Sequence, residues 1–291
     1  MKMKVISYCL FFPKQLPNHR FWDDYKNDVN RYFYNIPAVV MTNQMLFPDY
    51  ITRIYITKNL RNIYEIFNIL SEQCNLELIE IDIDYKLTEP TIFRMKPLWE
   101  NIGILHTRDL DSIISKKEYQ YMRSFETSSC SIGTLRSHEN HYGAGCKMLA
   151  GLSSFKPKKI PINIKGTSFL DYYKKSNHKY GCDQDLIIKT FTKDHDYTKS
   201  NFLDCKIHNQ TKSQDFPCIQ CSQIQLDEIP ISISKQKIFD RIHKLGYDSW
   251  AGVPVDCRGE YTSFISNYFF EIKNLMVKNK NMYQFYKIYE E

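Results

Sequence analysis

Two carboxylates one residue apart, Asp109 and Asp111, follow a short apolar run. The run, residues 101–107, has the length of a buried strand rather than that of a helix. Two acids at this spacing on a turn can face one hard cation, and Mg²⁺ or Mn²⁺ is typically held by one or two carboxylates together with water and substrate phosphates. We therefore expect Asp109 and Asp111 to bind a divalent cation that bridges a diphosphate.

The D-x-D spacing alone is weak evidence, because it occurs four times in the chain. The copy at 82–84 alternates with isoleucines and fits the solvent face of a strand, and the copy at 194–196 lies in a polar loop. Asp183 and Asp185 precede an apolar run that predicts a helix. Either acid could act as a general base, although Asp183 could instead simply cap the helix.

Strand patterns alternate with helix patterns around these acids. Strands are predicted at residues 5–11, 51–57, 76–83 and 101–107, and helices at residues 21–34, after Asn59 and after Ser115. Ser115 and Glu118 have the spacing of a capping box. This alternation predicts an α/β fold with a mostly parallel sheet flanked by helices, and Asp109 would lie at the edge where such folds bind ligands.

A second set of possible metal ligands lies towards the C-terminus. Cys205, His208, Cys218 and Cys221 have the C-x2-H and C-x2-C spacing of a tetrahedral zinc site, and an ordinary loop is the alternative. The nine cysteines are odd in number and scattered. We therefore expect reduced thiols and a cytoplasmic protein.

Length and composition set broad limits. The 291 residues, 43% of them hydrophobic, can bury a large core and suit one big domain. No segment approaches the roughly 20 apolar residues that span a bilayer, and the short run after Met1 predicts a strand rather than a signal peptide. The net charge of +6 is spread along the chain, and its densest run is at residues 156–159. A mild positive field favours anionic substrates, but solvated loop lysines explain that run equally well, and no nucleic-acid partner is expected for the predicted function.

Seven short motifs are spread along the chain: ISYCLF at 6–11, FPDY at 47–50, FR at 93–94, RDLDS at 108–112, LRSHENH at 135–141, GCDQD at 181–185 and WAG at 250–252. Together they resemble a family of nucleotide-sugar-dependent glycosyltransferases with the GT-A fold, whose members occur in bacteria, algae and the large DNA viruses of algae and amoebae. The resemblance covers most of the chain in the family's order. It implies a single GT-A domain over 1–291, with a nucleotide-binding half at 1–112 that ends in the D-x-D motif and an acceptor-binding half at 113–291.

The resemblance also implies roles for individual residues. Asp109 and Asp111 would bind Mn²⁺ or Mg²⁺ on the diphosphate of a UDP- or GDP-sugar donor, with Asp111 the more direct ligand. His208 matches a position where GT-A enzymes commonly have a third protein ligand for the metal, which would exclude it from a zinc loop. The residues implied to contact the donor are Arg94 and Arg108 near phosphate or ribose, Ser7 and Tyr8 near the base, and His138 near the sugar.

The chain departs from the family at two places. An acid is common where this chain has Ser137, and a Trp-Gly pair is common where it has residues 147–151. The pocket for the donor sugar is therefore expected to differ.

The predicted function is transfer of a hexose or pentose from a nucleotide sugar to a hydroxyl of a glycan or glycoprotein. One alternative is a metal-dependent nucleotidyl- or phosphotransferase that uses the same acidic turn on a triphosphate, although the chain contains neither G-x-x-x-x-G-K nor G-x-G-x-x-G. The other is a zinc-containing nucleic-acid-binding module built around residues 205–221.

Overall fold

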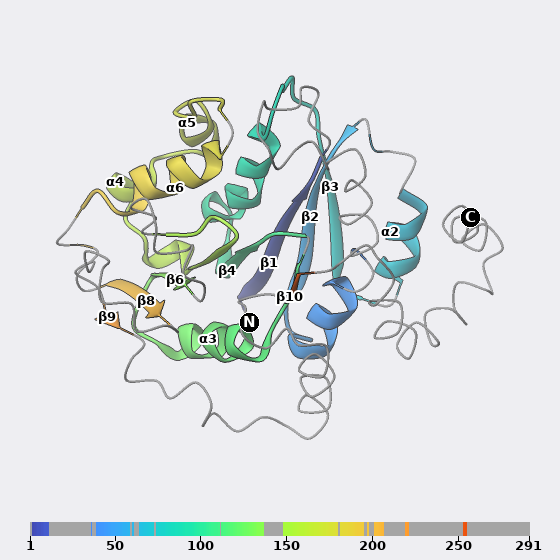
Figure 1. Cartoon of the computed structure of the whole chain (residues 1–291), viewed down its shortest axis with the longest axis horizontal. Helices are drawn as coiled ribbons and strands as arrows, with labels where there is room; N and C mark the ends of the chain where they lie inside the picture. Colours follow the sequence, from blue (N-terminus) through green and yellow to red (C-terminus); the bar gives the residue numbers. More distant parts are fainter. Residues whose placement is uncertain are drawn as a thin grey trace.

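Figure 1 shows the fold as a computed structural model. The structure describes residues 2–11, 36, 39–58, 60, 64–72, 74–110, 112–136, 148–179, 181–194, 197, 201–206, 219–220 and 253–254. The predicted helix at 21–34 lies outside these residues, as do Asp111, His138, His208, Cys218 and Cys221.

An eight-stranded sheet carries the fold, in the order β3-β2-β1-β4-β7-β6-β8-β9. Its strands are β1 (Met3–Leu10), β2 (Ile51–Thr57), β3 (Leu76–Ile81), β4 (Ile102–Arg108), β6 (Ile132–Arg136), β7 (Leu152–Phe155), β8 (Phe202–Lys206) and β9 (Ile219–Gln220). Every pairing is parallel except the two that β7 makes, with β4 and β6. The predicted class, an α/β fold with a mostly parallel sheet, is confirmed. Two short strands, β5 (Ser112–Ile113) and β10 (Val253–Pro254), pair separately.

Helices connect and cover these strands. They are α2 (Tyr64–Ser71), α3 (Lys116–Thr127), α4 (Ile162–Lys165), α5 (Phe169–Tyr173), α6 (Cys182–Phe191) and the 3₁₀ segments η3 (Glu89–Trp99) and η6 (Pro157–Lys159), and residues 39–46 are also helical. The predicted start of α3 is confirmed, because the Ser115 hydroxyl accepts a hydrogen bond from the Glu118 amide at 3.3 Å. Within the described part of the chain, none of the helices has the length and apolar character needed to cross a membrane.

Alternation along β1 separates two faces of the sheet. The Val5 side chain belongs to a buried cluster with η3, and the Cys9 thiol donates to the Pro90 carbonyl of η3 at 2.9 Å. On the opposite face, the Tyr8 hydroxyl bonds the Asn43 side chain at 2.9 Å, and Lys4 forms an ion pair with Glu126 of α3 at 3.1 Å. We call these the η3 face and the α3 face.

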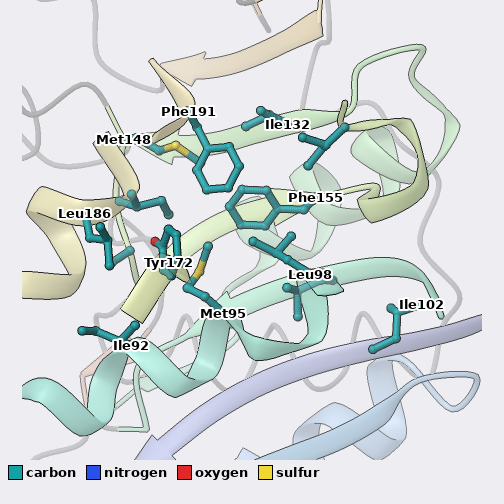
Figure 2. Close-up of a cluster of buried hydrophobic side chains, with 14 of the residues drawn as sticks. Ile92, Met95, Leu98, Ile102, Ile132, Met148, Phe155, Tyr172, Leu186 and Phe191 are labelled. Atoms are coloured by element: carbon teal, nitrogen blue, oxygen red, sulfur yellow. The ribbon is translucent and has the colours of Figure 1, made fainter. Parts of the chain in front are cut away.

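The core of the η3 face joins the elements that carry the predicted site. Figure 2 shows side chains from η3, from β7 and from α6 packed together, with the rings of Phe155 and Phe191 facing each other at 5.1 Å between centroids. Its buried members include Ile92 and Met95 of η3, Leu105 of β4, Met148 and Ala150 before β7, and Leu186, Ile187 and Phe191 of α6. Burying this apolar surface stabilises the relative positions of η3, β4 and α6.

A buried polar chain supports β4 on the α3 face. The Tyr50 hydroxyl donates to Glu126 at 2.7 Å, so its oxygen is available to accept from His106 Nε2 at 3.2 Å. His106 Nδ1 then accepts from the Ser154 hydroxyl at 2.6 Å. These partners suit a neutral imidazole protonated on Nε2. Burial, followed by the nearby charges of Arg123 and Arg108, lowers the pKa of His106 to about 3.

The buried imidazole should make unfolding depend on pH. Between pH 6.5 and about 3 the unfolded chain protonates His106 and the native protein does not, so this residue's contribution to stability is present above pH 6.5 and is lost as the pH falls. The free energy of unfolding, measured in urea, should fall by up to about 1.4 kcal/mol per pH unit more steeply in the wild type than in His106→Gln. Parallel pH curves for the two proteins would contradict a neutral buried His106.

Candidate active site

The sheet reverses its order between β1 and β4. From β1 the chain adds β2 and then β3 on one side, whereas β4 pairs with β1 on the other side. In open α/β sheets, ligands bind at such a switch point, outside the carboxyl ends of the strands. Asp109 follows the last residue of β4 and has a side chain that is 55% exposed, so its carboxylate lies at this edge and reaches solvent.

A single guanidinium joins two of the predicted site residues. Arg94 of η3 forms ion pairs through Nη1 with Oδ1 of Asp109 and through Nη2 with Oδ2 of Asp183. The side chains of Arg94 and Asp183 are only 6% and 8% exposed. A predicted metal ligand and a predicted catalytic acid, which lie far apart in the sequence, therefore meet on a buried positive charge.

The charges in this group stabilise one another. Burial by itself lowers the pKa of Arg94, but the carboxylates of Asp109 and Asp183 together raise it above its ordinary value, so the guanidinium stays charged. Asp183 lies in the first turn of α6, where the helix dipole also favours a negative group. The residue at the N-cap is Gly181, with φ of 71°, and not Asp183. The interpretation of Asp183 as a simple helix cap is therefore wrong.

Gln184, between the two acids, binds a turn that precedes β7. Its Oε1 accepts from the Ala150 amide at 2.9 Å, and its Nε2 donates to the Met148 carbonyl. We call residues 148–151 the Gly151 turn. Gly151 lies directly beneath Asp109, because a Cβ added to this glycine would overlap the Asp109 carboxylate. The turn therefore provides the backbone surface on which that carboxylate rests.

Asp185 points to the other side of α6. Its Oδ2 accepts from the Asn177 side chain at 2.8 Å, and both residues are exposed. The two acids of the D-Q-D motif therefore have different surroundings: Asp183 is buried on Arg94, and Asp185 is open to solvent.

Arg108 has different surroundings from Asp109 although the two are adjacent. Its side chain is 2% exposed and forms an ion pair with Glu118 of α3, whose side chain is also 2% exposed, and its Nη2 donates to the Ser112 carbonyl at 3.2 Å. Burial raises the pKa of Glu118 to about 7, although the charge of Arg108 opposes this shift. The described contacts of Arg108 anchor the end of β4 to α3, and its implied position near the donor phosphate rests on the resemblance alone.

Ser7 and Tyr8 lie inside β1 and not beyond its end, and neither side chain is exposed. Their implied contact with the nucleotide base therefore also rests on the resemblance. At the far side of the sheet, the backbone of Cys205 in β8 is paired with Leu135 of β6, and β8 is paired with residues 219–220. The other candidate zinc ligands lie outside the described residues.

The sequence reasoning missed the roles of three residues that shape this site. Gln184 and Gly151 bear directly on Asp109, and Glu118 holds Arg108. Only Glu118 had a usable signal in the sequence. Adjacent residues of a strand point to opposite faces, so Arg108 points away from the face of Asp109, and the helix that begins at Lys116 carries an acid that can pair with it. Nothing local in the sequence indicated the contacts of Gln184 and Gly151.

No protein-family model matches the chain, and no curated protein matches it. Among solved structures, the chain is similar to 4-diphosphocytidyl-2C-methyl-D-erythritol synthase from Anaerococcus prevotii, with 12% identity, a TM-score of 0.36, and coverage of 64% of this chain and 81% of that one. Similarity at this level carries no argument about function.

Proposed function

We propose that this chain is a metal-dependent glycosyltransferase that uses a nucleoside-diphosphate sugar as donor. The observation that carries the proposal is the position of Asp109, a solvent-reaching carboxylate at the switch point of the sheet that is joined through Arg94 to Asp183. This arrangement offers a hard-cation ligand, a fixed positive charge and acids on a neighbouring helix within one site.

The residues present fit a divalent cation in part. The carboxylate of Asp109 suits Mg²⁺ or Mn²⁺, which need only one or two protein carboxylates when substrate phosphates fill the other positions. Among the described residues, no three His, Cys, Asp or Glu side chains gather to hold a metal. Asp109 would therefore bind the ion with Asp111, with His208 as a further proposed ligand. When bound, the ion would supply Lewis-acid assistance to the departing diphosphate.

The chain's own residues would orient the metal ligand and activate the acceptor. Arg94 orients the Asp109 carboxylate through its contact with Oδ1 and adds positive charge beside the place proposed for the diphosphate. Asp185 is the more accessible of the two acids, and a base must come within about 3.2 Å of the hydroxyl it deprotonates. We therefore assign acceptor activation to Asp185 and the orientation of Arg94 to Asp183.

Glycine usage favours glycosyl transfer over nucleotidyl transfer. A nucleotidyl- or phosphotransferase is expected to hold its triphosphate in a glycine-rich loop. No glycine precedes Gly103 in this sequence, so no glycine-rich loop follows β1, β2 or β3. The acids of α6 instead suit an acceptor hydroxyl.

Thermal unfolding with UDP, GDP, CMP and ADP, each with and without Mn²⁺, tests the proposal. A ligand that binds only the folded state raises the unfolding temperature, and a concentration of 100 times its Kd should give a shift of roughly 5 °C or more. One nucleotide should stabilise the wild type only when Mn²⁺ is present. This metal-dependent shift should disappear in Asp109→Asn.

The matched control is Asp82→Asn, which removes the first acid of another D-x-D pair. Asp82 is exposed, directly follows β3, which lies two strands from β1 in the sheet, and forms an ion pair with Lys58 at 2.8 Å. The Asp82→Asn variant should keep the full metal-dependent rise in unfolding temperature that the nucleotide causes. Loss of the shift in both variants, or no metal-dependent shift in the wild type, would refute the proposed donor site.

A further inference from the structure

We infer that Gln184 is a positioning residue for Asp109 and acts through the Gly151 turn. The expected effect of Gln184 on metal binding rests on the proposed function, in which Asp109 is a metal ligand. Its geometric basis is independent of that function: Gln184 contacts the turn, the turn contacts Asp109, and Gln184 and Asp109 come from different elements.

The Gly151 turn is held from three directions. The Ala150 carbonyl accepts from the Thr107 hydroxyl of β4 at 2.6 Å, and the Leu149 amide donates to the Thr134 hydroxyl of β6 at 3.1 Å. Gln184 supplies the third support, from α6, with two hydrogen bonds to backbone groups two residues apart. Its amide matches one donor and one acceptor of the turn, which no carboxylate or apolar side chain of the same length can do.

Gly151 transmits this support to Asp109. The carboxylate occupies the space where any other residue at 151 would place its Cβ, so a small displacement of the turn moves the surface under the carboxylate. Arg94 fixes the same carboxylate from the side through Oδ1. Asp109 is therefore held between the Arg94 guanidinium and the Gly151 turn. Asp183 of α6 binds the guanidinium, and the next residue, Gln184, binds the turn.

Groups that orient a metal ligand influence metal affinity although they do not touch the metal. Gln184→Met should therefore weaken binding of Mn²⁺ with the nucleoside diphosphate by about 10- to 100-fold. Gln184→Glu keeps an acceptor for the Ala150 amide and should lose less. Gly151→Ala should weaken metal binding by a similar factor. It should cost little stability, because the added Cβ overlaps the end of the Asp109 side chain, which can rotate away.

Two measurements test the inference. The first is a double-mutant cycle of unfolding free energies, in urea without ligands, that combines Gln184→Met with Asp109→Asn. Coupling through the turn predicts non-additive losses, whereas the control cycle of Gln184→Met with Asp82→Asn should be additive. Additive losses in the first cycle would overturn the inference whether or not the protein binds nucleotides.

The second measurement is calorimetric titration of UDP and GDP with and without Mn²⁺, well below the unfolding temperature of every variant. Phe191→Leu, in the core at the far end of α6, controls for general destabilisation and should keep its metal-dependent affinity. If the wild type binds with Mn²⁺ and Gln184→Met binds as tightly, the inference is wrong. If the cycle is coupled but the wild type shows no metal-dependent binding, the proposed function fails and the positioning of Asp109 stands.

Discussion

In Arg94→Met, the free energy of unfolding should fall by about 3–5 kcal/mol at pH 7. The substitution removes the partner of Asp183, whose side chain is 8% exposed, and leaves a carboxylate that solvent can hardly reach. Asp109, which is 55% exposed, can be hydrated and should add little to the loss. Urea unfolding of the wild type and the variant measures the difference.

Two further variants separate the buried pair from a general effect of removing charge. Arg94→Met combined with Asp183→Leu replaces both charges with apolar groups and should recover much of the lost stability. Lys58→Met removes one partner of the exposed Lys58–Asp82 pair and should change stability by less than about 1 kcal/mol. If the double variant is no more stable than Arg94→Met, the loss does not come from an unpaired Asp183.

Local patterns in the sequence were sufficient for most of the elements in the first half of the chain. β2 occupies the predicted residues 51–57, β1 and β4 lie within a residue or two of their predicted bounds, and α3 begins at its capping hydroxyl. These features depend on side chains within one strand or one helical turn, and such signals are local. The predicted strand at 76–83 was two residues too long, because β3 ends at Ile81.

The elements that were not predicted have weak local signals. β6 and β7 are short, and η3 contains Pro90 and Pro97, which break the spacing by which helices are recognised. The antiparallel direction of β7 follows from the path of the chain between β6 and β4 and not from its residues. Tertiary packing decides such elements.

The acids of the candidate site were proposed from the sequence, but the contacts that link Asp109 to Asp183 were not predicted. Arg94 is 15 residues from Asp109 and 89 from Asp183, and these contacts exist only once η3 packs between β4 and α6. The resemblance pointed to Arg94 as a contact of the donor phosphate or ribose, whereas the structure adds that it binds both acids. Gln184 is a similar case, because its partners lie 34 and 36 residues away along the chain.

The different surroundings of the two acids on α6 predict different effects of replacing them. In Asp185→Asn, release of nucleoside diphosphate from the donor should fall by about 10²- to 10⁴-fold, the usual contribution of a general base. Its metal-dependent nucleotide affinity should not change, since Asp185 contacts Asn177 and not Arg94 or Asp109. The asparagine can still accept from Asn177, so stability should change by less than about 0.5 kcal/mol. The assay uses the donor sugar of the nucleotide found by the unfolding scan, with water and free monosaccharides as acceptors.

Asp183→Asn should behave in the opposite way. It weakens the ion pair that orients Arg94, so it should lower stability and metal-dependent nucleotide affinity together. Asp194→Asn, just beyond the other end of α6, should leave turnover unchanged, because the described hydrogen bond of Asp194 is with the Tyr197 amide at 2.9 Å and not with Arg94 or Asp109. If Asp183→Asn loses turnover and keeps its affinity while Asp185→Asn stays active, Asp183 is the base. Arg94 would then have to release Asp183 before the acceptor reacts, because both Nη atoms of Arg94 are engaged by carboxylates in this structure.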